Sequence, residues 1–340
     1  MMKAAVFYGP RDIKTEEVEK PKIQDNEILI KVKACGICGS DLHMYKLNLF
    51  SQILVRPLKK GGIPGHEYCG EIVEVGKNIK RYKKGDRVVA FSNGGMAEYV
   101  PVPIIYGYNV YKLPYSITYE EAATLEPLAN SYHAMMKGKP FNGANIVIYG
   151  AGAIGLGIIQ CLKALNIIPN KTIVVDLSDN RLNIAKKLGA DEIINAKTEN
   201  VFQKVLKLVG PSPQFGPSLF PIPKVDIIYD CVGYIKQQKA PLVLQQAINL
   251  ARQYTGTIVV HGIFEESVNL DLTFMIAKQI SIRGSFGFTP LEVKKCIRLL
   301  TSKQLDRSKI ISHEFPLDKA KEAFETQCNI DESVKVLIKP

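Results

Sequence analysis

The sequence lacks the features that mark several classes of protein. No window reaches the roughly 18 consecutive apolar residues that are needed to span a bilayer, and residues 1–14 contain no apolar core of the kind found in signal peptides. The 340 residues are 46% hydrophobic and 23% charged, a composition that excludes a disordered tail or a fibrous repeat. These absences predict a cytoplasmic protein with no membrane partner.

The cysteines and the charge balance narrow the function further. Seven cysteines, an odd number in a long chain, do not predict a disulfide framework, and we expect reduced thiols. The 44 Lys and Arg residues exceed the 33 Asp and Glu residues by 11, which would suit a nucleic acid. However, the basic residues are spread over helical faces and turns such as 80–84. We therefore predict a solvated surface and no nucleic-acid partner.

The pattern of apolar residues changes along the chain and predicts two domains. Short β-branched runs at 27–33, 71–75 and 87–91, separated by glycine turns, predict a β-rich sandwich or barrel over the first 110 residues. From Asn145 onward, predicted strands alternate with predicted helices. That alternation is typical of a doubly wound parallel sheet.

Two connecting segments carry signals of their own. Thr118 is an N-cap residue followed by an acidic first turn, and it predicts a helix that continues towards Met136. Five prolines within 210–223 exclude a helix or a central strand. This segment is either a surface loop or a polyproline segment that binds a partner.

Residues 150–155 read GAGAIG and lie between a predicted strand and an apolar helix. That context is typical of a turn that binds a dinucleotide, because Gly150, Gly152 and Gly155 permit a tight turn, a close approach of the pyrophosphate and close helix packing. The helix N-terminus favours the phosphates. Asp176 ends the next strand and would accept hydrogen bonds from the ribose hydroxyls, which favours NAD. Arg181 keeps NADP open, and a turn without a ligand is the other alternative.

A second set of residues suits a metal ion. Cys35 and Cys38 form a CxxC motif, which alone suggests a zinc knuckle, a redox pair or chance. No second CxxC or paired histidine lies nearby, as a structural zinc site would need, so a single ligating thiolate remains. His66, Glu67 and Glu126 follow downstream. One sulfur, one nitrogen and carboxylate oxygens form a zinc site with an open position for substrate.

Together these motifs make the sequence similar to the zinc-dependent medium-chain alcohol and polyol dehydrogenases, the group of sorbitol, threonine and 2,3-butanediol dehydrogenases. They occur in the order and spacing of that family over essentially the whole chain: 38–43 (CGSDLH), 65–67 (GHE), Gly76, 84–88 (KGDRV), 126–128 (EPL), 150–155, Asp176 and 230–233 (DCVG). The resemblance implies an α/β protein with a GroES-like β-rich catalytic domain at 1–130 and 286–340. A Rossmann domain at 131–285 would be inserted into it.

The resemblance also assigns a metal site. Cys38, His66 and Glu126 stand at the positions of zinc ligands, and Glu67 would be a direct or exchanging ligand. One catalytic zinc is expected per chain. Many relatives carry a second, structural zinc on a lobe with four cysteines, but residues 87–100 contain no cysteine. We therefore expect no structural zinc.

Zinc lowers the pKa of a hydroxyl that it binds, which prepares an alcohol to give a hydride to the nicotinamide. The resemblance places Ser40 where it can hydrogen-bond the substrate oxygen, and His43 where it can pass the proton to solvent. The alternative roles are a helix-capping serine for Ser40 and an ordinary surface histidine for His43.

Further cofactor contacts are expected from residues at strand ends or at the domain crevice: Ile154, Val232, Gly233, His261, Gly262, Ile263, Ser285 and Phe286.

We therefore expect an oxidoreductase that transfers a hydride between a secondary alcohol, diol or polyol and NAD, as a homodimer or homotetramer. The alternatives are a zinc-free NADPH-dependent quinone or enone reductase on the same fold and a dinucleotide-binding protein without activity. Loops at 44–58, 91–96 and 108–113 are expected to line the substrate pocket. Apolar and aromatic residues in or beside these loops, among them Tyr45, Leu54 and Tyr106, favour a small alcohol or diol over a polar sugar.

Overall fold

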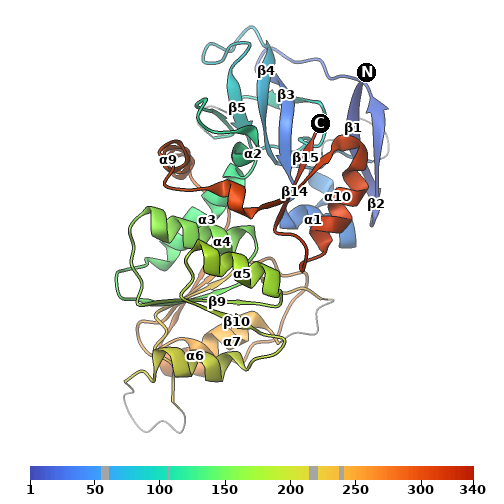
Figure 1. Cartoon of the computed structure of the whole chain (residues 1–340). Coiled ribbons are helices and arrows are strands. Elements are labelled where there is room, and N and C mark those ends of the chain that lie inside the picture. Colours follow the sequence, from blue (N-terminus) through green and yellow to red (C-terminus); the bar gives the residue numbers. More distant parts are fainter. Residues whose placement is uncertain (55–60, 106–107, 214–220, 237–240) are drawn as a thin grey trace. The chain divides into compact units, whose positions relative to one another are not determined.

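The computed structural model describes residues 1–54, 61–105, 108–213, 221–236 and 241–340, and the chain folds as two units (Figure 1). The first unit contains residues 1–127 and 289–340, and the second contains residues 128–288. Each junction lies three residues from the boundary expected from the sequence.

The first unit is built on a mixed sheet with the strand order β14-β15-β3-β4-β5-β7, to which β6 is added by pairing with β3. Its strands are β3 (Glu27–Gly36), β4 (Glu67–Val75), β5 (Arg87–Ala90), β6 (Tyr99–Pro103), β7 (Val110–Lys112), β14 (Ile311–Pro316) and β15 (Lys335–Lys339). Two further strands, β1 (Met2–Gly9) and β2 (Asp12–Val18), pair with each other. Because β15 pairs antiparallel with β3, the C-terminal end of the chain lies beside residues 35–36.

The first unit also contains helices, and some of them supply part of its core. They are α1 (Gly39–Leu47), α2 (Tyr119–Ala122), α9 (Pro290–Thr301) and α10 (Ala320–Cys328), with short 3₁₀ turns at Ser51–Ile53, Arg307–Ile310 and Leu317–Lys319. Phe324 of α10 is fully buried against Tyr45 of α1, with ring centroids 5.0 Å apart. Burial of two such large rings is a major source of stability.

The single helix predicted from Thr118 to Met136 is wrong, because the chain forms α2 and then α3 (Leu125–Gly138). Thr118 does cap α2, since its hydroxyl accepts the backbone N–H of Glu121. Pro127 lacks an amide hydrogen and is tolerated only in the first turn of a helix. A new helix therefore begins just before it, and Glu126 comes to stand in the first turn of α3.

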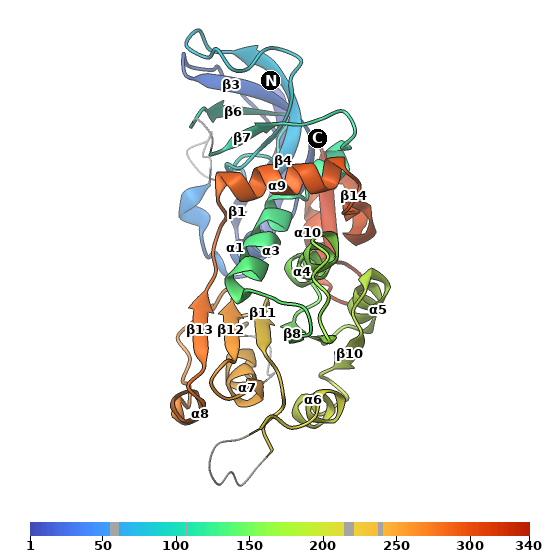
Figure 2. The ribbon, with the colours of Figure 1, turned by 90° about the vertical axis from the view of Figure 1, so that its left-hand side faces the viewer.

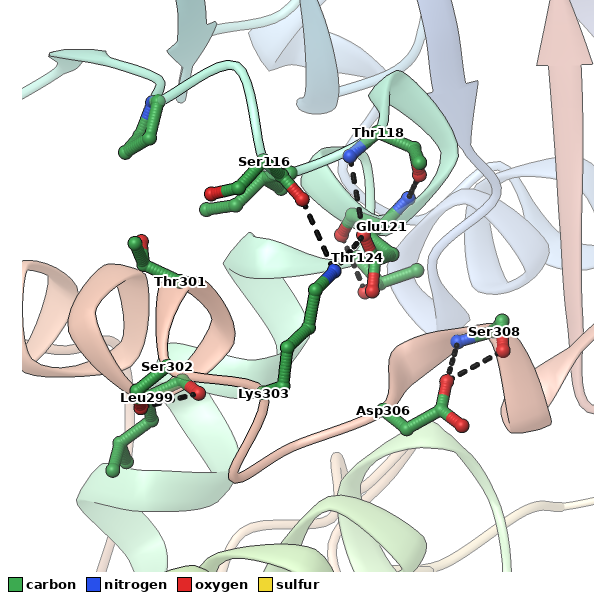
Figure 3. A network of polar contacts seen from close by, with 12 residues as sticks. Ser116, Thr118, Glu121, Thr124, Leu299, Thr301, Ser302, Lys303, Asp306 and Ser308 are labelled. Atoms are coloured by element: carbon green, nitrogen blue, oxygen red, sulfur yellow. Dashed lines mark hydrogen bonds and ion pairs between the residues drawn. The ribbon is translucent and has the colours of Figure 1, made fainter.

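The C-terminal part of the first unit is tied to the N-terminal part next to α2 (Figure 3). Lys303, just after α9, donates from Nζ to the carbonyl of Ser116 at 3.0 Å and lies 3.8 Å from a carboxylate oxygen of Glu121. The Lys303 side chain is 61% exposed. Because water screens such a pair, it contributes little to stability. By contrast, Arg307 is fully buried and donates from Nε to the hydroxyl of Thr124.

The second unit is a parallel sheet with the strand order β10-β9-β8-β11-β12-β13, part of which can be followed in Figure 2. The strands are β8 (Asn145–Tyr149), β9 (Lys171–Asp176), β10 (Glu192–Asn195), β11 (Ile227–Asp230), β12 (Thr257–Val260) and β13 (Ser281–Gly284). Helices α4 (Ala153–Ala164) and α5 (Asp179–Leu188) cover one face, whereas α6 (Val201–Val209) and α7 (Val243–Leu250) cover the other (Figure 1). The short α8 (Thr273–Lys278) precedes β13.

This strand order reverses direction between β8 and β11, which is the point where doubly wound sheets bind ligands beyond the carboxyl ends of their strands. Strand β8 is buried along its whole length, as expected for a central parallel strand. The predicted fold class, an α/β protein with a β-rich domain and a doubly wound parallel sheet, is confirmed.

Two other predictions concern the proline-rich segment 210–223 and the absence of a helix that spans a membrane. In the proline-rich segment, Pro211 and Pro223 form a β-bridge, but residues 214–220 lie outside the described residues, so neither interpretation of this segment is tested. Within the described part of the chain, no helix combines the length and the apolar character that crossing a membrane requires.

Candidate metal centre and nucleotide site

Three of the predicted metal ligands come together in the first unit. Cys38 is the N-cap residue of α1, and Glu67 is the first residue of β4, directly after His66. One ligand atom from each of these three side chains lies within 4.8 Å of the others. A thiolate, an imidazole and a carboxylate are donors that zinc prefers. The donor set therefore fits a zinc ion.

Negative charge is concentrated around this group. Asp41 Oδ2 accepts the backbone N–H of Cys38 at 2.9 Å, and Asp41 Oδ1 lies 3.9 Å from Nδ1 of His66. Burial raises the pKa of the Cys38 thiol, and the charges of Glu67 and Glu126 add to this effect. Burial by itself would lower the pKa of His66, but Cys38, Asp41 and Glu126 raise it well above its usual value. The carboxylates around the thiol and the imidazole therefore favour positive charge at this place.

Glu126 is near this cluster but is not one of the three side chains of the 4.8 Å group found among the described residues. It lies in the first turn of α3, and its charge influences both Cys38 and His66. Its role as a ligand stays a prediction.

Lys335 is a residue of this site that the sequence reasoning missed. Its ammonium lies 2.5 Å from Oε2 of Glu67 and also donates to the carbonyl of Ile37 at 2.9 Å. The exposed fractions of the Lys335 and Glu67 side chains are 2% and 0%. A lysine in a short C-terminal strand carries no signal in the sequence that would place it beside a residue so far away along the chain.

The carboxylate of Glu67 is held in a space that depends on Gly36. A methyl group on Gly36 would lie 2.3 Å from Oε2 of Glu67, which is closer than any real contact. The other oxygen, Oε1, is buried and accepts no hydrogen bond in the described structure. A buried carboxylate oxygen without a partner is costly. A cation bound by Cys38 and His66 would supply the missing partner.

Ser40 and His43 both lie on α1 and are half-buried. Residues three apart on a helix share a face, so the two side chains are neighbours on the surface of α1. Their predicted roles in proton transfer stay predictions.

The pocket walls inferred from the sequence need a correction. Tyr45 belongs to α1 rather than to a loop, and its fully buried ring donates its hydroxyl to Glu325 at 2.6 Å. Leu54 is also part of the core. Both were misassigned because an aromatic or apolar side chain suits a core as well as a pocket. Tyr106 and residues 55–58 lie outside the described residues.

In the second unit, the glycine-rich turn has the geometry of a phosphate cradle. Gly150 has a φ of +94°, a conformation that favours glycine. A methyl group on Gly155 would lie 1.9 Å from the carbonyl oxygen of Gly150, so helix α4 approaches the turn too closely for any side chain. Gly152 caps α4, and a methyl group there would meet only Arg181 Nη1, at 3.9 Å. The space over Gly152 is therefore open. Ile154 follows in the first turn of α4 and is half-buried.

Asp176, the last residue of β9, lies against this turn. Its Oδ2 accepts the backbone N–H of Ala151 at 2.6 Å, and its Oδ1 accepts the N–H groups of Leu177 and Ser178. The structure thus brings together the glycines, Asp176 and Arg181 that the sequence singled out.

A second glycine pair lies beyond the ends of β11 and β12. Gly233 has a φ of +72°, and a methyl group on it would lie 2.1 Å from the carbonyl oxygen of Ile263. A methyl group on Gly262 would lie 1.9 Å from the amide nitrogen of Gly233. The segments containing Val232 and Ile263 therefore pack backbone against backbone, and only glycine permits this contact.

His261 and Ser285 also meet at this edge of the sheet. Nδ1 of His261 lies 3.3 Å from the hydroxyl of Ser285, and burial lowers the pKa of His261 to about 4. The imidazole is therefore neutral at physiological pH. Phe286, in contrast, is 91% exposed. Ser285 therefore lies beside His261, another predicted cofactor residue, whereas the role of Phe286 stays a prediction.

Comparison with known proteins places the chain in a family. Residues 24–115 match the model of the alcohol dehydrogenase GroES-like domain, and residues 153–302 match that of the zinc-binding dehydrogenase. Sorbitol dehydrogenase of Rattus norvegicus is 32% identical over 94% of this chain and 91% of its own. The (R,R)-butanediol dehydrogenase of Bacillus subtilis is 30% identical over 100% of both chains.

Solved structures agree with these matches. The crystal structure of 2R,3R-butanediol dehydrogenase from Bacillus subtilis covers 100% of both chains with a TM-score of 0.84 and 28% identity. An alcohol dehydrogenase from Escherichia coli CFT073, solved with the cofactor NADH, covers 100% of this chain and 99% of its own with a TM-score of 0.82 and 26% identity. The chain belongs to the zinc-binding medium-chain alcohol dehydrogenases. The predicted family and oxidoreductase activity are confirmed, and neither the zinc-free reductase nor the non-catalytic alternative is favoured.

Proposed function

We propose that the protein oxidises a secondary alcohol, diol or polyol with NAD, using one zinc ion per chain. The observation that carries this proposal is the group formed by the half-buried Cys38 and His66 and the buried Glu67, in which Glu67 Oε1 lacks a partner. The substrate class rests on the relatives, a sorbitol dehydrogenase and a butanediol dehydrogenase.

The residues of the first unit take the following roles in this proposal. Cys38, His66 and Glu126 hold the metal ion, which when bound supplies Lewis acidity towards the substrate oxygen. Glu67, restrained by Lys335, offers Oε1 to the ion as a further or exchanging ligand. Ser40 hydrogen-bonds the substrate oxygen, and its hydroxyl takes the substrate proton only as it passes its own proton on.

The proton then needs a route to solvent. His43 lies on the same helix as Ser40 and is half-buried, so it can exchange protons with water. Proton transfer therefore runs along the surface of α1 in this proposal.

The second unit binds the nucleotide. The open space over Gly152, at the N-terminus of α4, suits a pyrophosphate, because the amides and the helix dipole both favour negative charge. Asp176 accepts a hydroxyl of the adenosine ribose and disfavours a 2′-phosphate, so NAD is preferred over NADP even though Arg181 is close. Val232, Gly233, His261, Gly262, Ile263 and Ser285 contact the nicotinamide half.

Two further properties belong to this proposal. None of the seven cysteines, all of which the structure describes, forms a disulfide, which supports a cytoplasmic location. The homodimer or homotetramer stays a prediction.

Metal analysis and a substrate panel test the proposal. We expect one zinc per chain in the wild-type protein and none in Cys38→Ala, which should also lose activity. Cys296→Ala, which removes a fully buried thiol outside the metal site, should keep both zinc and activity. The panel contains secondary alcohols, diols, polyols and threonine, each with NAD and NADP. A wild-type protein with no zinc or with two, or a preference for NADP, would contradict the corresponding part of the proposal.

A further inference from the structure

We propose that Asp176 is a positioning residue for the glycine-rich turn, in addition to its role towards the coenzyme ribose. This inference rests on the proposed nucleotide site. It adds that pyrophosphate binding and ribose recognition depend on one carboxylate, so the two cannot be changed separately at this position.

The hydrogen bonds of Asp176 use most of its acceptor capacity. Oδ1 accepts the N–H groups of Leu177 at 2.7 Å and Ser178 at 2.9 Å, and Oδ2 accepts the N–H of Ala151 at 2.6 Å. Each carboxylate oxygen has two lone pairs. Both lone pairs of Oδ1 are therefore used. Oδ2 has one lone pair left, which can accept a hydrogen bond from a single ribose hydroxyl.

The bond to Ala151 fixes the turn at its centre. Ala151 is fully buried and stands between Gly150 and Gly152. The neighbouring amide, that of Gly150, donates to the carbonyl of Val175 at 2.8 Å. Two successive amides of the turn are therefore held by two successive residues at the end of β9. This pairing sets the direction in which the following amides of α4 face a phosphate.

Removal of the carboxylate leaves the buried N–H of Ala151 without the acceptor that the structure gives it. A buried donor without an acceptor costs the whole desolvation of that group, so the turn would rearrange to find another partner. A rearranged turn no longer presents its amides to the pyrophosphate in the same geometry. Binding of any nucleoside diphosphate would weaken, whether its ribose carries hydroxyls, a 2′-phosphate or neither.

This coupling predicts the result of a substitution meant to change the coenzyme preference from NAD to NADP. Asp176→Gly removes the repulsion of a 2′-phosphate but also the anchor of the turn. We expect this variant to lose NAD affinity without gaining NADP affinity. Asn is no substitute, because its amide group would direct N–H bonds towards either Ala151 or Leu177 and Ser178.

The test uses Asp176→Asn and, as a matched control, Asp179→Asn. Asp179 carries the same charge in the first turn of α5, is exposed, and accepts a hydrogen bond from Asn195 instead of from the turn. The probe is 2′,3′-dideoxy-ADP, which has a pyrophosphate but no ribose hydroxyl. Amide hydrogen exchange of the peptide 148–156, followed by mass spectrometry in the nucleotide-free protein, reports on the turn directly.

We expect Asp176→Asn to bind dideoxy-ADP about tenfold more weakly than Asp179→Asn does, or weaker still, since a hydrogen bond to a charged group is lost. Exchange within 148–156 should be faster in Asp176→Asn than in Asp179→Asn. Asp176→Glu keeps the charge but moves the carboxylate by one methylene, and it should show the same two effects if Asp176→Asn does not fold.

Equal binding of dideoxy-ADP by the two asparagine variants, together with equal exchange, would overturn the inference and leave Asp176 with a ribose role alone. A gain of NADP affinity in Asp176→Gly would also overturn it. Failure of the proposed function would look different, because the wild-type protein would then bind neither NAD nor dideoxy-ADP. The exchange comparison would still decide the role of Asp176.

Discussion

Lys335 and Glu67 form a buried ion pair between two strands that are 268 positions apart in the chain. Strand β15 carries Lys335 next to the end of β3, and β4 carries Glu67 to the same place from the other side of β3. The ammonium occupies Oε2 and leaves Oε1 without a partner. The pair therefore restrains a carboxylate whose other oxygen, Oε1, still lacks a positively charged partner.

We expect Lys335→Met to destabilise the protein strongly. The substitution leaves the buried Glu67 carboxylate without its counter-charge, and breaking a buried pair from one side costs about 3–5 kcal/mol. Chemical denaturation of the metal-free protein, compared with the wild type, measures the change in the free energy of unfolding.

Three variants control for this effect. Lys335→Met combined with Glu67→Gln removes both charges and should recover much of the loss, as a double-mutant cycle would show. Lys335→Arg should recover part of it. Lys303→Ala removes an exposed lysine that joins the same two parts of the first unit, and it should change stability by less than about 1 kcal/mol. Equal losses for Lys335→Met and Lys303→Ala would contradict the importance of the buried pair.

Gly36→Ala should weaken zinc binding. The added methyl group would lie 2.3 Å from Oε2 of Glu67 and must displace the carboxylate. Changes in groups that orient metal ligands typically reduce affinity by about 10–100-fold. Gly39→Ala is the matched control, because a methyl group there meets nothing within 4 Å. Competition titrations with a chelator measure both affinities, and equal values for the two variants would refute this prediction.

Zinc should stabilise the protein by mass action. A ligand that binds only the folded state at about 1,000 times its dissociation constant adds about 4 kcal/mol. The wild-type protein should therefore lose thermal stability on chelation and regain it when zinc is returned. Cys38→Ala should show neither change. A scan in which the chelator shifts Cys38→Ala as much as the wild type would place the metal elsewhere.

Asp230 should make stability fall as the pH rises through the acidic range. Burial raises its pKa to about 6, although N–H groups of Gly233 and Val232 oppose this shift. An unfolded aspartate has a pKa of about 3.9. Between these two values the folded state holds a proton that the unfolded state has released, so stability decreases with rising pH. The loss is complete above about pH 6 and amounts to about 3 kcal/mol.

Comparison with Asp230→Asn isolates this effect, because other titrating groups are common to both proteins. The difference in unfolding free energy between wild type and variant should shift in favour of the variant from about pH 4 to about pH 6. Above that range it should stay constant. A difference that does not change with pH would mean that Asp230 titrates normally in the folded state.

Much of the fold could be predicted from local sequence alone. Strand–helix alternation after Asn145 predicts the parallel sheet, because each element must bury an apolar face of its own period. Gly150, Gly152 and Gly155 are recognisable because only glycine tolerates the left-handed turn and the close backbone contacts found there. The helix break before Glu126 could also have been read from Pro127, but the apolar periodicity concealed it.

The sequence by itself determined which residue types are available: a thiol, an imidazole and carboxylates in the family's order, and an aspartate at the end of β9. Only the tertiary structure decided how they are used. It brought Lys335 to Glu67, and it set Asp176 against the amide of Ala151. The physical reason is that local patterns specify which face a side chain takes, whereas strand pairing between distant segments decides which oxygen is occupied and which one stays free for a ligand.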